Sequence, residues 1–441
     1  MRRLADRGMK GLARLLVHVF FRRIELQNGD RLPATGPVVL VANHLNGLVD
    51  GLLLMATLGR YPRFLGKSTL FKILPLWPFL KFAGVIPVYR VIDGAPGDHN
   101  VSAFATCHKI LAGGGTVALF PEGISHDESS LQPLRTGAAR IALEAGADGG
   151  IAGVVTVAVG LTYDAKARFR SRALVRVAEP VSISRWSETH RSEGRDAVRQ
   201  LTDDVAQQLT TVSPAYASWE QAERLSRVAD VVARPPAVGL PADVTMADRV
   251  DVTERLAGAE QGHARRTEVR RLLATFEAYE RDLELLGLSD AQVAAKYGQG
   301  KLRGAVLWSV LKVVVALPLA AIGVVVHVVP YQIIKQLAKR PANEGMKATV
   351  KLLGCSALFS VVYVALGIVV GRAVGPWAGL LVAVGAPLCG YVTVRVAERV
   401  KRIGGLVEGY RTVKDRKVVL ATVFAHRTAV VDAARAVLVV S

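Results

Sequence analysis

The feature that most constrains the fold is an alternation of short apolar runs with helix-like stretches between Pro37 and about Pro180. The apolar runs have the length and composition of strands, and the stretches between them have helical spacing. This alternation predicts an α/β layered domain with a mostly parallel or mixed central sheet. The predicted strands are Val38–Ala42, Val85–Val88, Thr116–Phe120, Val154–Leu161 and Leu174–Val177, and the predicted helices are Gly51–Gly59, Asn100–Ala112 and Thr136–Ala145.

Residues 1–34 predict an amphipathic helix ahead of this domain, which we place at residues 35–186. The apolar stretch is interrupted by Arg14 and lacks a small-residue cleavage site, so we do not expect a signal peptide. We expect the helix to associate with an anionic membrane, and the alternative is a helix packed on the protein's own core. The apolar side chains at helical spacing are Leu12, Leu15, Leu16, Val19 and Phe20, and the basic ones on another face are Lys10, Arg14, His18 and Arg22.

A change in composition marks residues 187–303 as a charged helical region. Prolines between Arg234 and Pro241 indicate a break, and a long helix is predicted from about Val252 to Leu286. We interpret the arginines of this helix as a solvated face, with phosphate or lipid-headgroup contact as the alternative. These arginines are Arg265, Arg266, Arg270 and Arg271.

Long apolar segments occupy much of residues 304–400, the predicted membrane region. Residues 352–371 and 377–394 are each long enough to cross a bilayer, which takes about 20 residues, and the short link between them predicts a transmembrane helical hairpin. Basic residues flank both ends of the hairpin, so both ends are expected on the cytoplasmic side. They are Lys335, Lys339, Arg340, Lys347 and Lys351 before it and Arg395, Arg399, Lys401 and Arg402 after it.

The apolar segment 304–330 differs, because basic clusters stand at both of its ends. We therefore expect a re-entrant or interfacial segment, with a bend at Pro318, and not a full span. Residues 401–441 are expected to form a basic C-terminal tail. The alternative for all the apolar segments is a set of core helices in a soluble domain, which their length and low polarity disfavour.

The formal net charge of +19 indicates an anionic partner, such as a phospholipid membrane or a phosphorylated substrate. Aromatic residues make up only 6% of the chain, so nucleic-acid binding by base stacking is not expected. Cys107, Cys355 and Cys389 lack metal-ligand spacing, and we expect reduced packing residues and no metal site.

The first of four ordered motifs, Asn43–Asp50, places a histidine and an aspartate around a predicted turn. Six residues apart, His44 and Asp50 would point about 120° apart in a regular helix, so they can pair only across a strand-to-helix turn. Asn46-Gly47 favours such a turn. A carboxylate on one imidazole nitrogen fixes the tautomer and makes the other nitrogen a better base toward a hydroxyl. The alternative is a structural or accidental pair.

Two further motifs, Gly84–Arg90 and Phe120–His126, supply candidates for substrate binding. Arg90 follows a predicted strand and suits phosphate capture, with a surface salt bridge as the alternative. Glu122, beside the turn residue Gly123, could bind an acceptor hydroxyl or orient Arg90, or it could be a solvated carboxylate. Lys67 and Arg135 are additional phosphate candidates, since Arg135 stands just before a predicted helix.

With the fourth motif, Val157–Leu161, these blocks resemble the glycerolipid acyltransferase family, which comprises glycerol-3-phosphate and 1-acylglycerol-3-phosphate acyltransferases. The resemblance covers about residues 35–185. It implies a layered acyltransferase domain, a general base paired with an aspartate, an acyl-CoA or acyl-carrier-protein donor, a phosphorylated glycerol acceptor, and neither metal nor cofactor. The expected catalytic residues are His44 and Asp50, and the expected substrate-binding residues are Arg90, Glu122, Gly123, Lys67, Arg135 and Asn43.

This sequence departs from the common family pattern in two places. The acid is Asp50, with Val49 at the commoner acid position, and Ala158 stands where the fourth block usually has proline. The stretch after Gly123 and the C-terminal hairpin look more like the long fungal-type glycerol-3-phosphate acyltransferases and their bacterial relatives. The apolar segments and the basic residues that flank them predict a cell-membrane protein with its catalytic domain on the cytoplasmic face. The alternatives are another lysolipid acceptor and a non-catalytic lipid-binding protein.

Overall fold

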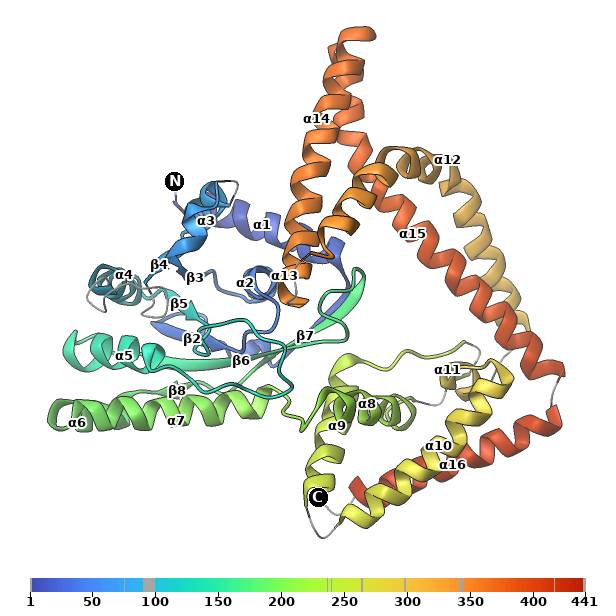
Figure 1. Cartoon of the computed structure of the whole chain (residues 1–441), viewed down its shortest axis with the longest axis horizontal. Helices are drawn as coiled ribbons and strands as arrows, with labels where there is room; N and C mark the ends of the chain where they lie inside the picture. Colours follow the sequence, from blue (N-terminus) through green and yellow to red (C-terminus); the bar gives the residue numbers. More distant parts are fainter. Residues whose placement is uncertain are drawn as a thin grey trace. The chain divides into compact units, whose positions relative to one another are not determined.

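The computed structural model describes residues 2–74, 76–89, 100–235, 237–238, 240–262, 265–296, 299–340, 344–415 and 417–438 (Figure 1). The chain divides into two compact units. The first unit comprises Met1–Ala215 together with Ala338–Leu353, and the second comprises Tyr216–Leu337 and Gly354–Ser441. We call Ala338–Leu353 the returning segment, because it joins the first unit from far along the chain.

An eight-stranded mixed sheet forms the centre of the first unit, as the alternation predicted. The strand order is β1-β7-β6-β2-β5-β3-β4, and β8 pairs with β6. Every pairing along the run from β6 to β4 is parallel, whereas β6 pairs antiparallel with β7. The carboxyl ends of β6, β2, β5, β3 and β4 therefore meet at one edge, where sites in such sheets gather. The strands are β1 Phe21–Gln27, β2 Val38–Ala42, β3 Pro62–Lys67, β4 Ile86–Val88, β5 Thr116–Leu119, β6 Val155–Tyr163, β7 Ser171–Val177 and β8 Val181–Ser182.

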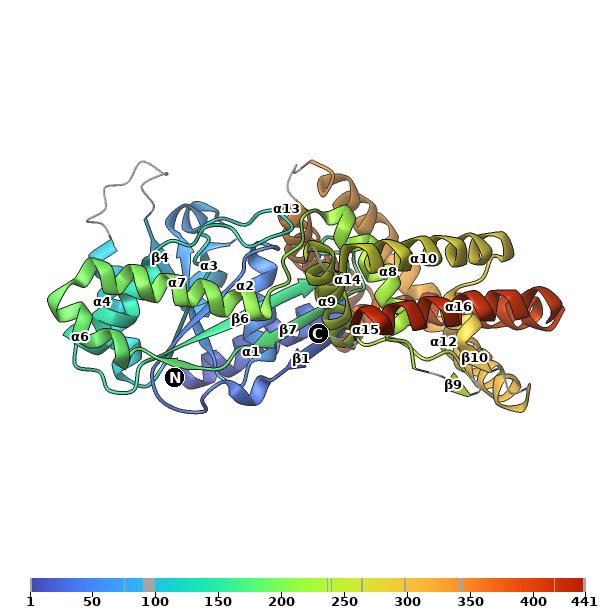
Figure 2. The same cartoon turned by 90° about the horizontal axis from the view of Figure 1, so that it is seen from below.

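Helices cover both faces of this sheet (Figures 1 and 2). Strand β2 shows why: Val38 and Leu40 face one hydrophobic core, and Val39 and Val41 face the other, as the period of a strand requires. The first core includes side chains of α1 and α2, and the second includes those of α4, α5 and α7. The helices of this unit are α1 Arg2–Phe20, α2 Leu48–Thr57, α3 Trp77–Ala83, α4 Val101–Ala112, α5 Gly137–Leu143, α6 Ser184–Ser192, α7 Gly194–Val212 and α13 Glu344–Thr349.

The predicted domain boundary at residue 186 is wrong. Helix α7 buries Leu201, Val205 and Leu209 in the second core of the first unit, so this unit runs on to Ala215. The helical spacing of these side chains makes an apolar stripe that only the sheet face can cover. The sequence pattern also missed β1 and β3, in which charged residues and a proline interrupt the apolar pattern.

Helix α1 packs on the protein's own core with one face, which was the alternative interpretation. Met9, Ala13 and Val17 are fully buried. Leu12 and Leu15 lie on the exposed side, and the Leu15 side chain is 62% exposed. Membrane contact by this exposed apolar face remains a prediction.

The second unit has its own helical core, formed by α8 Trp219–Val232, α9 Met246–Gln261, α10 Arg266–Leu286 and α16 Lys417–Leu438. Two expectations are corrected here. The single long helix predicted over 252–286 is two helices, α9 and α10, separated near Gly262. The predicted C-terminal tail is helical, and α16 buries Val423, Val430 and Val437 in this core.

A buried ion network holds this second unit together. Asp290, at the start of α11 Asp290–Ala294, accepts hydrogen bonds from Arg234 Nε at 2.5 Å, Arg427 Nε at 2.8 Å and the Tyr279 hydroxyl at 2.9 Å. These residues come from four separate segments, so the network fixes how the segments pack.

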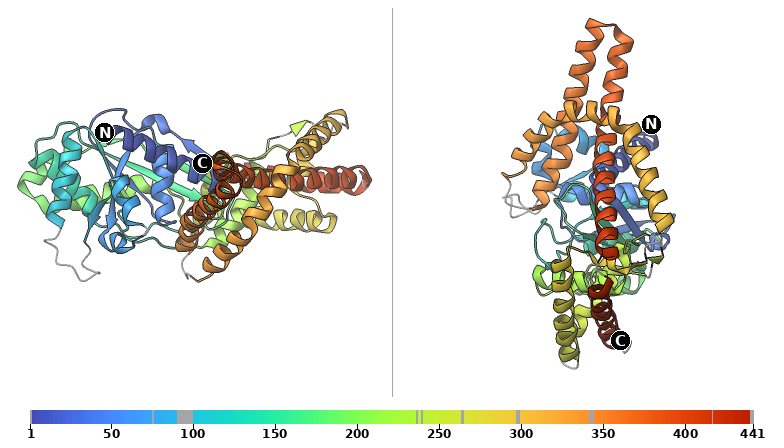
Figure 3. Two further views of the ribbon diagram at one scale, coloured as in Figure 1. Left: turned by 90° about the horizontal axis from the view of Figure 1, so that it is seen from above. Right: turned by 90° about the vertical axis from the view of Figure 1, so that its right-hand side faces the viewer.

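Among the described residues, three helical stretches are long and apolar enough to cross a membrane, by length and composition. They include α12 Gln299–Leu337, α14 Cys355–Ala373 and α15 Pro376–Asp415. Helices α14 and α15 form the predicted hairpin, and their backbones approach closely at Gly367 and Gly379. Helix α12 is continuous through Pro318 and Pro330, but it is bent along its course, as Figures 1 and 3 show. Proline inside a helix is a recognised cause of such kinks.

The cysteines are free thiols, as expected. Cys107 and Cys389 are buried, which fits packing residues. Burial raises the pKa of the Cys107 thiol to about 12.

Candidate active site

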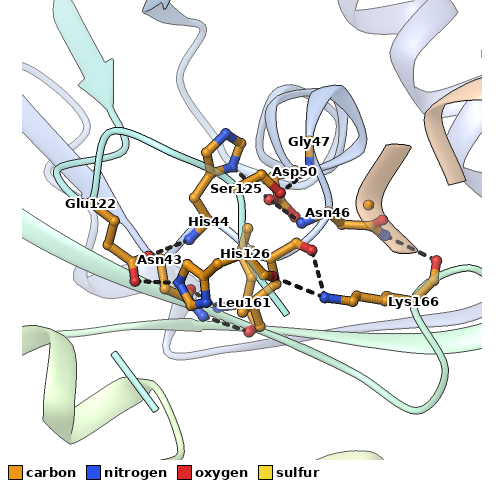
Figure 4. Close-up of polar contacts among 12 residues, drawn as sticks. Asn43, His44, Asn46, Gly47, Asp50, Glu122, Ser125, His126, Leu161 and Lys166 are labelled. Carbon is orange, nitrogen blue, oxygen red and sulfur yellow. Dashed lines mark hydrogen bonds and ion pairs between the residues drawn. The ribbon is translucent and has the colours of Figure 1, made fainter. Parts of the chain in front are cut away.

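His44 and Asp50 form the predicted pair across the turn between β2 and α2 (Figure 4). His44 Nδ1 lies 2.9 Å from Asp50 Oδ2. The Asp50 side chain is 0% exposed and that of His44 is 18% exposed, so the histidine alone faces outward. Gly47 makes the turn possible: its φ of +56° is a conformation that glycine adopts without steric cost.

Asp50 is held from three directions. It lies in the first turn of α2, where a carboxylate is stabilised by the exposed backbone N–H groups. Its Oδ2 also accepts the Asn46 backbone N–H at 2.7 Å, and its Oδ1 accepts the Tyr163 hydroxyl at 2.5 Å. Burial, together with the neighbouring Asp50 carboxylate, raises the pKa of Tyr163 well above its usual value, so the phenol stays a donor. Asp50 therefore has a fixed orientation toward His44.

The imidazole of His44 is fixed by stacking as well as by Asp50. Its ring lies flat on Phe120, with 4.0 Å between ring centroids and 9° between planes. Its backbone N–H donates to Glu122 Oε1 at 2.7 Å. Among the described residues Nε2 makes no hydrogen bond, and Figure 4 shows the ring directed away from the network beneath it. A histidine arranged in this way can accept a proton at Nε2 while Asp50 stabilises the resulting imidazolium.

Glu122 binds the backbone of His44 and fixes its position. Both of its oxygens are engaged: Oε1 by His44, and Oε2 by the Gln132 backbone N–H at 2.8 Å and by His126 Nε2 at 2.5 Å. Its side chain is fully buried. In the structure the Glu122 carboxylate therefore contacts protein donors, and a contact with the acceptor stays a prediction.

Asn43, expected to bind substrate, has its side-chain amide bonded to the backbone of β6. Its side-chain Nδ2 donates to the Leu161 carbonyl at 3.0 Å, and its Oδ1 accepts the Leu161 N–H at 2.7 Å. These two bonds join the end of β2 to β6, so the first and fourth motifs are physically linked.

The remaining substrate-binding candidates lie at the same edge or outside the described residues. Gly123 has a φ of +76°, and a Cβ there would lie 2.5 Å from Arg135 Nε. The exposed Arg135 side chain thus lies over Gly123, just ahead of α5, where an anion would also meet helical N–H groups. Lys67 ends β3 and is paired in register with Val88. Arg90 lies outside the described residues.

Several residues that the sequence analysis missed complete the site. Tyr163 lies two residues beyond the predicted end of its strand, and the alternating pattern of β6 was the signal that could have included it. Lys166 donates to the carbonyls of Leu45 and His126, each at 3.0 Å, and pairs with Asp127. No local pattern marks such a residue, because its partners lie 121 and 40 positions away.

Most residues of this site lie within a stretch of the chain that matches a known protein family. Residues 7–161 match the model of the family described as Acyltransferase. The chain therefore carries an acyltransferase domain, and it is of the glycerolipid type to which glycerol-3-phosphate and 1-acylglycerol-3-phosphate acyltransferases belong.

The similar proteins include three yeast relatives. Glycerol-3-phosphate O-acyltransferase 2 of Saccharomyces cerevisiae is 29% identical, over 44% of this chain and 26% of the relative. Glycerol-3-phosphate O-acyltransferase 1 of the same yeast is 26% identical, over 55% and 32%. An uncharacterized acyltransferase of Schizosaccharomyces pombe is 25% identical, over 63% and 54%. The chain thus matches between about a quarter and about half of the length of these relatives.

A solved structure is similar too. It is the 1-acyl-sn-glycerophosphate acyltransferase PlsC of Thermotoga maritima, at 19% identity and a TM-score of 0.35, covering 47% of this chain and 81% of that chain.

Proposed function

We propose that this protein transfers a fatty acyl group from acyl-CoA or acyl-carrier protein to a hydroxyl of glycerol-3-phosphate or 1-acylglycerol-3-phosphate. The observation that carries the proposal is the pair of His44 and Asp50, in which Nδ1 is held by a buried carboxylate and Nε2 faces outward. Two of the three yeast relatives act, by their names, on glycerol-3-phosphate.

The chemistry needs a base but no protein nucleophile. His44 Nε2 takes the proton of the acceptor hydroxyl as the oxygen attacks the thioester carbonyl. The tetrahedral intermediate then collapses, the C–S bond breaks, and the proton passes from His44 to the departing thiolate. The products are the ester and the free thiol of the donor. Arg135, Lys67 and Arg90 are the proposed contacts for the acceptor phosphate.

We further infer that the hairpin of α14 and α15 crosses the membrane and that α12 does not. The returning segment packs in the catalytic unit, so the carboxyl end of α12 is on the catalytic side. The hairpin leaves from and returns to that side. Gln292, shortly before α12, donates to the Gly405 carbonyl at 2.6 Å, beyond the apolar part of α15. Both ends of α12 are then on the catalytic side, which suits a bent helix that enters the leaflet and returns.

Labelling tests this arrangement directly. With the native cysteines replaced, R303C and K339C are expected to react with an impermeant maleimide from the same side of sealed vesicles. Labelling from opposite sides would mean that α12 spans. The basic clusters around the hairpin favour the cytoplasmic side for the catalytic unit.

The exposed apolar surface of the first unit supports membrane contact by the catalytic domain itself. Leu15 on α1 is 62% exposed, and near α3 Leu74 is 84% exposed and Trp77 44% exposed. The Lys81 ammonium lies 5.0 Å from the centre of the Trp77 ring, so a cation that a lipid phosphate could bind stands beside an exposed apolar side chain. A fluorophore at L15C should be quenched by brominated lipids, and an unquenched label would exclude this contact.

The activity test uses purified protein in lipid nanodiscs with palmitoyl-CoA or palmitoyl-carrier protein. Glycerol-3-phosphate and 1-acylglycerol-3-phosphate are offered in parallel, and released thiol is measured. His44→Ala is expected to abolish turnover. His190→Ala is the matched control, because His190 Nε2 lies 3.1 Å from Asp148 Oδ2 in a similar pair outside the site.

Equal turnover by His44→Ala and wild type would refute the proposed base. Turnover with a different lysolipid alone would mean that the proposed acceptor is wrong and that the proposed acyl-transfer chemistry is right. Absence of turnover with every donor and acceptor would favour the lipid-binding alternative.

A further inference from the structure

We propose that the returning segment, Ala338–Leu353, positions the catalytic turn, so that the rate of acyl transfer depends on residues that precede the membrane hairpin. This inference rests on the proposed function. It assigns a role to a stretch that, by sequence, is only the basic flank of an apolar helix.

The segment contacts the catalytic turn directly. A Cβ on Gly47 would lie 3.0 Å from Thr349 Oγ1 and 3.5 Å from the Gly345 carbonyl oxygen, so α13 lies against the turn between His44 and Asp50. Gly47 has a φ of +56°, and a change in this angle would move the turn. Its backbone N–H donates to Ser125 Oγ at 3.1 Å, on the other side.

Two more contacts attach the segment to the neighbouring loops. The Glu344 N–H donates to Asp127 Oδ2 at 3.2 Å, and Lys351 Nζ donates to the Ala167 carbonyl at 2.5 Å. Burial opposes ionisation of Asp127, but the Lys166 ammonium and the Glu344 N–H outweigh it and lower the pKa of Asp127. The loops after β5 and β6 are therefore both tied to the returning segment.

The same loops are tied to the catalytic turn. Lys166 donates to the Leu45 carbonyl, and Asn46 Nδ2 donates to the Lys166 carbonyl at 3.0 Å. Figure 4 shows Lys166 and Asn46 side by side next to the turn. A shift of the returning segment would thus reach the turn both directly, at Gly47, and through Lys166.

Packing makes the segment part of the catalytic core. Ala348 is 0% exposed and Leu352 is 4% exposed, in the same hydrophobic core as Val49 and Leu52 of α2. Because cores are close-packed, a larger side chain at Ala348 must move α2 or the segment.

The test compares Lys351→Met and Ala348→Leu with Lys339→Met, a matched control on an exposed residue of the same segment. Lys351→Met is expected to lower kcat about tenfold, because misplacing a catalytic group by a fraction of an ångström has effects of this order. The KM for the acceptor should change less than kcat. Lys351→Arg, which keeps a cation that can reach the carbonyl, should restore most of the rate.

A second readout does not depend on turnover. The rate at which diethyl pyrocarbonate modifies His44 is measured by peptide mass spectrometry, with His190 as the internal reference. The rate at His44 should change in Lys351→Met and Ala348→Leu, and the rate at His190 should not. If wild-type protein turns over no acceptor, the proposed function fails while this comparison still tests the positioning role.

Two outcomes would overturn the inference. One is that both variants match Lys339→Met in kcat and in His44 modification. The other is a lowered melting temperature with unchanged kcat and unchanged His44 reactivity, which would make the segment a purely structural support. If Ala348→Leu does not fold, Lys351→Met alone decides.

Discussion

Tyr163 offers a sharp single test of the site, because its hydroxyl contacts Asp50, the carboxylate that pairs with His44. Tyr163→Phe removes one hydroxyl and keeps the ring, which stacks on Phe21 with centroids 5.7 Å apart. The lost bond is the 2.5 Å contact to a fully buried carboxylate. Hydrogen bonds to charged groups contribute about 1.5–3 kcal/mol. Asp50 keeps its bonds to His44 and Asn46, so the lower end of that range applies.

If this loss is felt in the transition state, kcat/KM falls about tenfold, since 1.36 kcal/mol corresponds to one factor of ten. The same buried carboxylate loses a partner in the ground state, so the melting temperature should also fall by several degrees. The assay is thioester cleavage under saturating donor with varied acceptor, together with a thermal unfolding scan of the same preparation. The pH–rate profile should keep its basic limb, because the Tyr163 phenol is protonated throughout the working range.

Tyr61→Phe is the matched control for this prediction. The Tyr61 hydroxyl donates to the Ala83 carbonyl at 3.0 Å, in the same unit but away from the pair of His44 and Asp50. It should lose about 1 kcal/mol of stability, as for a neutral hydrogen bond, and keep its activity. Wild-type kcat/KM in Tyr163→Phe, or an equal loss of kcat/KM in Tyr61→Phe, would refute the view that Asp50 is oriented by Tyr163.

Three further predictions follow from single contacts. Gly123→Ala should raise the KM for a phosphorylated acceptor several-fold, because the new methyl group displaces Arg135. Gly150→Ala is the control for backbone strain, because Gly150 has a similar positive φ and open space around it. Equal effects of the two substitutions on KM would contradict a role for the contact between Gly123 and Arg135. Cys107 should resist alkylation at pH 8 until the protein unfolds, because with a pKa of about 12 only about one thiol in ten thousand is ionised. The contribution of the buried neutral thiol to the free energy of unfolding is fully present below pH 9 and is lost as the pH rises toward 12. Rapid labelling of the native protein would contradict this prediction. Asp290→Asn should cost about 3–5 kcal/mol of stability in the second unit, because two arginines lose their buried partner; an unchanged melting temperature would show that water replaces the carboxylate.

The sequence predicted best those elements whose apolar pattern is uninterrupted. Strand β2 was predicted to the residue, because each of its five side chains is buried between two cores. Strand β1 was missed because its sequence mixes charges with apolar residues, and its pairing with β7 is set by contacts about 150 positions away. The end of the layered domain was misplaced because α7 is amphipathic, and its polar face dominated the composition.

The site shows the same division between local and remote information. The pairing of His44 with Asp50 could be predicted, since both residues belong to one turn and their spacing allowed only a turn. The contacts of Glu122 and Asn43 could not, because most of their partners are backbone groups of other segments. A sequence pattern marks which side chains carry chemistry, and it does not show whether their hydrogen-bonding capacity is already used by the fold.

Lys351 makes this limit concrete. In the sequence Lys351 is a basic residue just before an apolar helix, and the rule that positive charges flank membrane helices on the cytoplasmic side would account for a lysine there. In the structure its ammonium caps the Ala167 carbonyl, in the loop that also receives Asn46. Helix α14 begins four residues later, at Cys355. One residue can therefore satisfy a topological rule and also contact a loop beside the catalytic turn. Thr349, whose side chain lies against Gly47, stands six residues before the start of α14. The sequence could indicate the positive charge of Lys351, but not the carbonyl that it contacts.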